Sequence, residues 1–159
     1  MRILVFSDSH GTLEPMRRAI ERFSPDTVIH LGDYVEDSAA LEREYPFQAL
    51  IRVRGNCDAG YYDVASEATP CWQGVRFLAV HGHRYGVKAG LLRLSYAAQE
   101  EGAQVVLFGH THIPFCEQTM GRWFINPGAC GGAAPTCAVV ELQNGTVSCR
   151  IVSISEEEK

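Results

Sequence analysis

The sequence contains no long apolar run. Its 159 residues hold no stretch near the roughly 18 apolar residues that a membrane helix needs. The run from Ile3 to Phe6 is also shorter than the core of about 7 to 15 residues typical of a signal peptide. We therefore expect a cytoplasmic protein with no membrane partner.

Positive charge is scarce as well. The formal net charge is -5 at pH 7, which gives no general attraction to nucleic acid or to anionic membranes. Stable nucleic-acid binding is not expected. An anionic substrate would need a local source of positive charge.

Paired cysteines, linkers and repeats are also missing. The six cysteines are scattered without a C-x-x-C pair, which favours free thiols, with Cys137 and Cys149 filling strands.

The segment "SDSHGT" lacks the G-x-G-x-x-G of dinucleotide-binding folds. The chain is also shorter than the roughly 250 residues of a (β/α)8 barrel, which argues against a barrel-type amide hydrolase. We expect one domain over residues 1–159, with 155–159 as a solvated tail.

What the chain does contain is one pattern used six times, in which a short hydrophobic run is followed at once by small and polar residues. Runs of 4 to 5 residues bounded in this way predict buried strands. The six are "ILVF", "TVIHL", "LIRV", "RFLAV", "VVLF" and "WFI", and "CAVVEL" and "TVSCRIVSI" predict a further pair around an Asn-Gly turn.

Helical patterns separate the early strands. The first runs to Phe23, with Thr12 as its predicted N-cap and Pro15 in its first turn. Two more are predicted at about Ser38 to Tyr45 and about Lys88 to Glu101, the latter ending at Gly102 and burying Leu91, Leu92, Leu94 and Ala98. Alternating strands and helices predict an α/β layer arrangement.

The polar segments after the strands are expected to meet at one edge of the sheet, where open α/β sheets bind ligands. Alone, an aspartate there is usually a turn former and a histidine is usually solvated. Together, several carboxylates and imidazoles need divalent cations to balance them. The set comprises Asp8, His10, Asp33, Asn56, Asp58, His81, His83, His110 and His112.

Seven of these residues predict a metal centre. The set is Asp8, His10, Asp33, Asn56, His81, His110 and His112. Mixed nitrogen and oxygen donors suit Mn, Fe, Co, Ni or Zn, and seven are too many for one ion. Two ions fit if a carboxylate bridges them. Asp33, beside a glycine that allows close approach, is the best bridge. Asp8-x-His10 and His110-x-His112 would each point two side chains to one side of an extended segment.

The ordered motifs D-x-H, G-D, G-N-x-D, H-G-H and G-H-T-H resemble the calcineurin-like metallophosphoesterase family, and most closely its small prokaryotic phosphodiesterase branch. The resemblance implies a single α/β (α+β) domain in which two mixed β-sheets pack as a sandwich with flanking helices. It implies one metal held by Asp8, His10, Asp33 and His112, and a second held by Asp33, Asn56, His81 and His110.

The function implied is hydrolysis of a small phosphodiester or phosphate ester by a hydroxide that bridges two divalent ions, with manganese the first choice. Homo-oligomers are compatible with this reading. The alternative is a non-catalytic metal-binding scaffold or protein-interaction module of the same fold.

The chain departs from the family pattern at two places. Cys57 stands where many relatives have a histidine thought to protonate the leaving group, so His83 and Asp58 become candidates for an acid or orienting role. The segment "NPGACGGAAPT" has only small residues where relatives often show a serine and a basic residue. Its backbone amides could partly substitute in binding phosphate.

Overall fold

The computed structural model describes residues 1–47 and 49–156, and its strands form two sheets. The first sheet has the order β11-β10-β1-β2-β3. Its strands are β1 (Arg2–Phe6), β2 (Thr27–His30), β3 (Ala49–Arg52), β10 (Thr136–Gln143) and β11 (Thr146–Ser153).

The second sheet has the order β4-β6-β7-β9-β8, with β5 paired to β6. Its strands are β4 (Glu67–Ala68), β5 (Cys71–Trp72), β6 (Val75–Val80), β7 (Val105–Leu107), β8 (Phe115–Thr119) and β9 (Arg122–Asn126). Both sheets are mixed, since β1, β2 and β3 run parallel to one another, as do β6, β7 and β9, and the other pairings are antiparallel. The expected pair of mixed sheets is therefore confirmed.

Alternation along the strands builds the core. In β1, Ile3 and Val5 face the second sheet and pack in one cluster with Phe77 of β6, whereas Leu4 and Phe6 face the helices. Successive side chains of a strand point to opposite faces, so a strand buried on both faces must be apolar throughout, as "ILVF" is. The two sheets pack face to face on this cluster.

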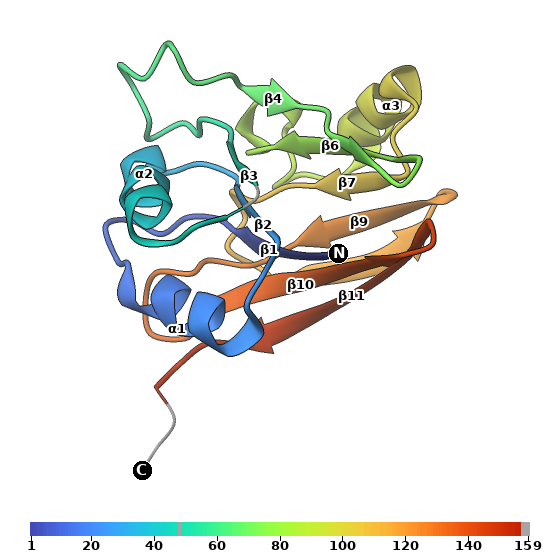
Figure 1. Cartoon of the computed structure of the whole chain (residues 1–159). Coiled ribbons are helices and arrows are strands. Elements are labelled where there is room, and N and C mark those ends of the chain that lie inside the picture. The colour runs from blue at the N-terminus through green and yellow to red at the C-terminus, as the bar shows by residue number, and fades with distance from the viewer. Residues whose placement is uncertain (48, 157–159) are drawn as a thin grey trace.

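Three helices cover the outer faces (Figure 1). The helices α1 (Glu14–Phe23) and α2 (Val35–Glu44) pack on the first sheet, and α3 (Leu92–Glu101) packs on the second. A short 3-10 helix, η1, covers His83–Tyr85. Within the part of the chain that the structure describes, no helix has the length and apolar character to span a membrane.

The helix ends differ from the sequence-based expectations. The helix α1 begins at Glu14 after Leu13, without a side-chain cap, so the prediction of Thr12 as its N-cap is wrong; Pro15 does lie in its first turn. The helix α3 starts four residues later than predicted and ends at Gly102, as expected. Leu92 is 62% exposed, contrary to its predicted burial, because it lies in the first turn of α3 and not on its inner face.

The strand predictions hold for all six runs and for the hairpin, whose register pairs Gln143 with Thr146 around Asn144-Gly145. The short strands β4, β5 and β8 were not predicted. The six cysteines are free thiols, as expected. Of the predicted tail, Ser155 and Glu156 are exposed and 157–159 lie outside the described residues.

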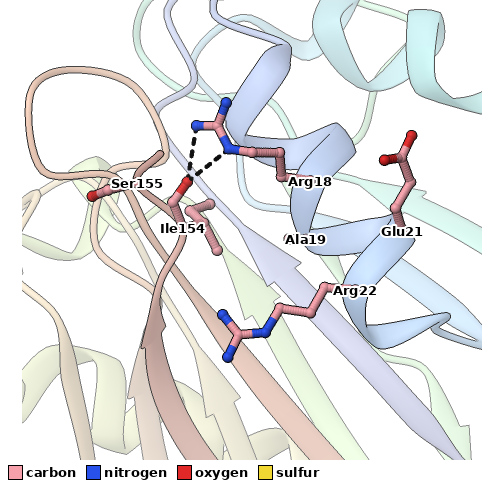
Figure 2. A pocket seen from close by; sticks show the side chains of 6 residues that line it. All are labelled: Arg18, Ala19, Glu21, Arg22, Ile154 and Ser155. Atoms are coloured by element: carbon pink, nitrogen blue, oxygen red, sulfur yellow. Dashed lines mark hydrogen bonds between the residues drawn. The ribbon is translucent and has the colours of Figure 1, made fainter. Parts of the chain in front are cut away.

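The segment after β11 is tied to α1. The Arg18 guanidinium donates two hydrogen bonds to the carbonyl oxygen of Ile154, at 3.3 and 3.0 Å (Figure 2). A cavity of about 440 Å³ lies beside this contact. None of the seven predicted metal ligands lines it.

Candidate metal centre

Loops from both sheets meet at the carboxyl ends of their parallel strands. Asp8, Asp33 and Asn56 follow β1, β2 and β3 of the first sheet, whereas His81 and His110 follow β6 and β7 of the second. The backbone N–H of Asp8 donates to the Gly32 carbonyl at 3.0 Å, and His110 N–H donates to Asp8 Oδ2 at 3.1 Å. The predicted edge site therefore exists, but two sheets share it.

The backbone of these loops is unusual. The φ angles are positive at five of the seven predicted ligands, Asp8 (55°), His10 (49°), Asp33 (57°), His110 (68°) and His112 (61°). The expectation of extended D-x-H and H-x-H segments is therefore wrong. The left-handed residues curl each segment, and the curl brings the two side chains of each pair toward one centre. Such strained residues concentrate at functional sites.

Two glycines allow the β2 and β3 loops to touch. A Cβ on Gly55 would lie 2.1 Å from Asp33 Oδ1, and one on Gly32, at φ 100°, would lie 2.4 Å from the Gly55 nitrogen. Any side chain at Gly55 would displace the Asp33 carboxylate. The close approach expected beside Asp33 is therefore present on both sides of the contact.

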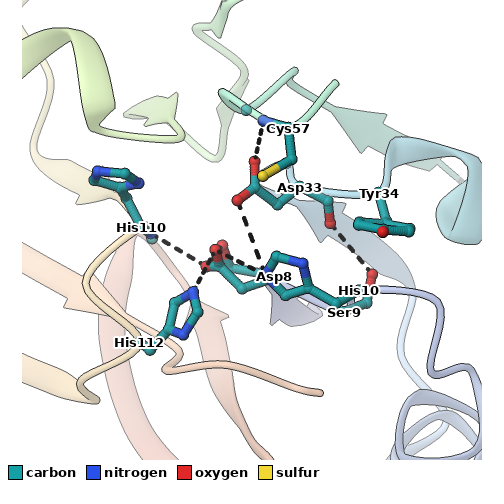
Figure 3. A network of polar contacts seen from close by, with 12 residues as sticks. Asp8, Ser9, His10, Asp33, Tyr34, Cys57, His110 and His112 are labelled. Atoms are coloured by element: carbon teal, nitrogen blue, oxygen red, sulfur yellow. Dashed lines mark hydrogen bonds and ion pairs between the residues drawn. The ribbon is translucent and has the colours of Figure 1, made fainter. Parts of the chain in front are cut away.

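Asp8 presents one carboxylate oxygen to the centre. Its Oδ2 accepts from Ser7 Oγ at 2.5 Å and from His110 N–H, which fixes the carboxylate plane. Its Oδ1 lies 3.0 Å from His112 Nε2 and 3.9 Å from His10 Nε2 (Figure 3). Asp8 has no exposed surface, whereas both histidine side chains are partly exposed.

Asp33 presents its two oxygens to different histidines. Oδ1 lies 3.5 Å from His81 Nε2 and Oδ2 lies 3.9 Å from His10 Nε2. Burial opposes ionisation, but the Cys57 N–H bonded to Oδ1 at 2.9 Å and the nearby His81 bring the pKa of Asp33 below its usual range. Asp33 is thus ionised at neutral pH, with its two oxygens directed at histidines of different loops.

His81 has a lone pair directed at other acceptors. Its Nδ1 lies 2.8 Å from the Leu31 carbonyl oxygen, which can only accept, so Nδ1 carries the proton and Nε2 of the neutral ring is bare. This Nε2 lies 3.0 Å from Asn56 Oδ1 and 3.2 Å from His110 Nδ1. Burial and His81 both lower the pKa of His110, and Lys88 adds to the effect. Asn56 Oδ1 has no proton to give to this Nε2, whereas His110 Nδ1 donates to it in one of the two His110 tautomers. A cation placed among these atoms would satisfy the lone pairs of all three residues.

The donor atoms therefore fit divalent ions. Sets of three ligand atoms lie within 4.8 Å of one another in Asp8, His10 and His112, and in Asp8, Asp33 and His81. These groups combine imidazole nitrogen with carboxylate oxygen, which is the donor set expected for Mn, Fe, Co, Ni or Zn.

A buried hydrogen-bond chain holds the β1 loop against α2. Gly32 N–H donates to His30 Nδ1 at 3.2 Å, so the proton of neutral His30 is on Nε2, which faces Ser9 Oγ at 3.0 Å. The Ser9 hydroxyl donates to Asp37 Oδ2 at 2.6 Å. Ser9 lies between Asp8 and His10, so the chain fixes that loop. Sequence reasoning missed Ser9 and Asp37.

Asp58 and His83, the two candidate acids, differ in their surroundings. The Asp58 carboxylate is 3% exposed and accepts four backbone N–H groups, from Asp33, Tyr34, Val35 and Gly55. His83 has a buried Nδ1 without a hydrogen-bond partner among the described residues. Burial and the neighbouring His81 lower its pKa.

Two further features bear on the departures from the family pattern. Burial and Asp33 raise the pKa of the Cys57 thiol, so it stays protonated at neutral pH and is a poor nucleophile.

In the small-residue segment, Cys130 N–H donates to Ser7 O at 2.9 Å and Gly131 N–H to Asp8 O at 3.2 Å. Those two amides support the Asp8 loop and are not available to phosphate.

Comparison with known families gives a direct match. Residues 1–145 fit the model of the calcineurin-like phosphoesterase superfamily domain. The chain belongs to this superfamily. A probable metallophosphoesterase of Bacillus subtilis, YsnB, is 38% identical over 133 residues, covering 81% of this chain and 75% of the relative. Phosphodiesterase MJ0936 of Methanocaldococcus jannaschii is 30% identical, covering 90% and 94%.

Among solved structures, Vps29 of Entamoeba histolytica in complex with Zn²⁺ superposes with a TM-score of 0.79 at 18% identity, covering 98% of this chain and 100% of that one. At that identity the likeness shows the fold alone. The calcineurin-like phosphoesterase fold of this chain thus carries candidate metal-binding residues at the carboxyl ends of its parallel strands.

Proposed function

We propose that this protein is a binuclear metal-dependent phosphoesterase whose preferred substrates are phosphodiesters. The observation that carries the proposal is the bare Nε2 of His81, which faces two oxygen acceptors, Asn56 Oδ1 at 3.0 Å and Asp33 Oδ1 at 3.5 Å. Acceptors gathered in this way are costly unless a cation lies among them. The names of the relatives YsnB and MJ0936, a probable metallophosphoesterase and a phosphodiesterase, support the same activity.

The ligand sets we propose are those that the family resemblance implies, and the distances are compatible with them. Asp8, His10 and His112 would hold one ion, Asn56, His81 and His110 would hold the other, and Asp33 would be shared by both. Manganese is our first choice of ion. When bound, the two ions supply a hydroxide nucleophile near neutral pH and neutralise the phosphoryl oxygens.

The protein's own groups set the geometry. Asp8 and Asp33 are oriented by Ser7 and by the Cys57 amide, so neither carboxylate needs to reorganise when an ion binds. Leu31 fixes the tautomer of His81 through Nδ1. The partly exposed His10 and His112 mark the side of the centre that is open to substrate.

Neither candidate acid is well suited to donate a proton. Both Asp58 oxygens accept backbone N–H bonds, so we assign Asp58 an orienting role at the start of α2. The lowered pKa of His83 leaves its ring neutral at neutral pH. Diesters with good leaving groups are therefore the expected substrates, since such leaving groups depart without protonation.

The decisive experiment is turnover of bis(p-nitrophenyl) phosphate by the Mn²⁺-loaded protein. We expect turnover that chelator abolishes and added Mn²⁺ restores. Asp33→Asn should lose at least about a hundredfold in rate, because the bridge is then neutral.

Turnover unaffected by exhaustive chelation would disprove the metal-dependent mechanism. Metal binding without turnover of any phosphate ester, with any divalent ion, would favour the alternative of a metal-binding scaffold. The fold shared with Vps29 is compatible with that alternative.

A further inference from the structure

Beside the metal centre lies a cavity of about 410 Å³. Its walls are apolar, formed by Val87, Leu91, Phe108, Ile113 and Phe115. Phe108 and Val87 are buried, whereas Ile113 is 68% exposed at the rim. Ile113 thus extends the apolar lining of the cavity to the protein surface.

The cavity is continuous with the loops that carry the ligands. Thr111 lines it and lies between His110 and His112. Val87, on the opposite wall, packs against Gly82, where an added Cβ would lie 2.8 Å from Val87 Cγ2. Gly82 in turn follows His81. The cavity therefore adjoins three of the proposed ligands through two separate loops.

The lining described contains two polar side chains, Thr111 and Lys88. The Thr111 hydroxyl already accepts from Asn126 Nδ2 at 2.9 Å and from Ile113 N–H at 3.1 Å. Lys88 is exposed and is the one charged residue among the described residues that line the cavity. A ligand group in this cavity would thus meet apolar surface and, at the rim, a single positive charge.

We propose that this cavity binds the apolar organic group, aryl or alkyl, of the phosphoester whose phosphoryl group lies at the metal centre, with Lys88 beside the anionic end. The proposal rests on the proposed function. It defines a substrate class: esters in which an uncharged ring or chain is joined directly to the phosphate. A nucleobase fits this cavity less well, because its polar edge would find only Thr111 and Lys88 as hydrogen-bond partners among the described residues of the lining.

The test separates the ring from the phosphoryl group. Methylphosphonate and phenylphosphonate carry the same anionic head, so the ratio of their inhibition constants against bis(p-nitrophenyl) phosphate reports the cavity alone. We expect phenylphosphonate to inhibit about tenfold more tightly, as about 1.4 kcal/mol of added apolar contact would give.

The variant Ile113→Asn should bring this ratio close to one while leaving the constant for methylphosphonate unchanged. Met120→Asn is the matched control. Met120 is also an exposed apolar residue, at 52%, but it lies in the β8–β9 turn outside the cavity. Equal inhibition by both phosphonates, or an Ile113→Asn effect on both alike, would overturn the proposal while leaving the phosphoesterase function intact.

A second readout needs neither metal nor turnover. The chain has two lysines, Lys88 and Lys159, so reductive ¹³C-methylation places few probes, and the Lys88 signal is assigned by its loss in Lys88→Arg. In the presence of chelator, 1-naphthylphosphonate should shift this signal and methylphosphonate should not, and Ile113→Asn should abolish the shift. If no ester is turned over, the proposed function fails. The cavity proposal is then still decided by whether 1-naphthylphosphonate, and not methylphosphonate, shifts the Lys88 signal.

Discussion

His10 illustrates how much the metal centre demands of single residues. It has a φ of 49°, a left-handed conformation that costs a non-glycine residue on the order of 1 kcal/mol. Its Nε2 lies 3.9 Å from both Asp8 Oδ1 and Asp33 Oδ2, too far for hydrogen bonds in the absence of an ion. We therefore expect His10 to direct its Nε2 at an ion while adding little to the stability of the metal-free fold.

A pair of substitutions at His10 separates these two contributions. His10→Gly and His10→Ala both remove the imidazole, so both should lose metal affinity and rate. Glycine relieves the backbone strain, so the metal-free His10→Gly protein should be more stable than His10→Ala by about 1 kcal/mol. Urea unfolding of the two chelated variants measures the difference. Equal stabilities would show that the left-handed backbone is not strained.

Asn56 and Cys57 provide a second residue-scale test. Asn56→Ala removes the oxygen that lies 3.0 Å from His81 Nε2, so metal content and rate should fall together. Cys57→Ser keeps the backbone N–H that bonds Asp33 and should retain most of the activity. Metal content by elemental analysis and initial rates check both. Loss of activity in Cys57→Ser, with metal content and rate retained in Asn56→Ala, would indicate that the Cys57 thiol is the nucleophile.

The candidate ligands could be selected from the sequence because each follows a hydrophobic run, where strands end, and the structure places them around one centre; their role as ligands stays a prediction. Their backbone conformation could not be predicted, since an aspartate or histidine is compatible with either hand of φ until its neighbours are placed. The roles of Ser9 and Asp37 depend on a contact 28 residues apart, and neither stands in a motif. Those contacts exist only once β1 and α2 pack together.

Among the elements, the start of α2 depends on a residue outside the helix. Three consecutive backbone N–H groups at this start, those of Asp33, Tyr34 and Val35, donate to the Asp58 carboxylate at 2.7 to 3.0 Å. The first amides of a helix have no partner within it, and Asp58 supplies that partner from the loop after β3. One carboxylate thereby joins two of the loops that carry ligands.

Removing this anchor should weaken the fold. Asp58→Ala leaves four backbone N–H groups without this acceptor, three of them buried. The expected loss in unfolding free energy is about 3 kcal/mol or more. Asp63→Ala, at an exposed aspartate nearby, should change stability by less than about 0.5 kcal/mol. Chemical denaturation of both metal-free variants tests the assignment. A near-neutral effect at Asp58 would refute it.

The helices and strands could be predicted where the apolar residues of the sequence are also the ones that the fold buries. Short apolar runs bounded by small and polar residues gave the central strands correctly. The two-residue strands β4 and β5 are too short to carry a period, and β8, with Glu117 and Gln118 exposed, has too little apolar character to be seen. The early start of α2 escaped prediction because its cap comes from Asp58, more than twenty residues later.

Across the whole molecule, buried histidines couple stability to acid. His30 is fully buried, and burial lowers its pKa from 6.5 to about 4, against the opposing effect of Asp37. The unfolded chain therefore takes up a proton at this residue in a range where the folded chain does not. The contribution of neutral His30 to the unfolding free energy is complete above pH 6.5 and is lost as the pH falls toward 4.

The expected size of this loss follows from the pKa difference, at about 1.4 kcal/mol per unit, and is about 3 kcal/mol between pH 6.5 and 4. Unfolding free energies of the chelated protein at several pH values measure it. His30→Gln, which cannot titrate, should show a shallower slope over this interval even if it is less stable throughout. Parallel slopes for the two proteins would contradict the assignment.

The division of the ligands between the two sheets has a mechanical consequence. Four of the proposed ligands follow strands of the first sheet and three follow strands of the second. With ions in place, coordination bonds would therefore join two layers that otherwise meet through apolar contacts and a few hydrogen bonds, such as that from His110 N–H to Asp8 Oδ2. Apolar contacts have no fixed direction and allow sliding, whereas a ligand bond resists shear. A pulling force that drives one sheet past the other should therefore meet more resistance in the metal-loaded protein than in the chelated protein. In the metal-loaded protein the coordination bonds should be the last contacts between the sheets to break.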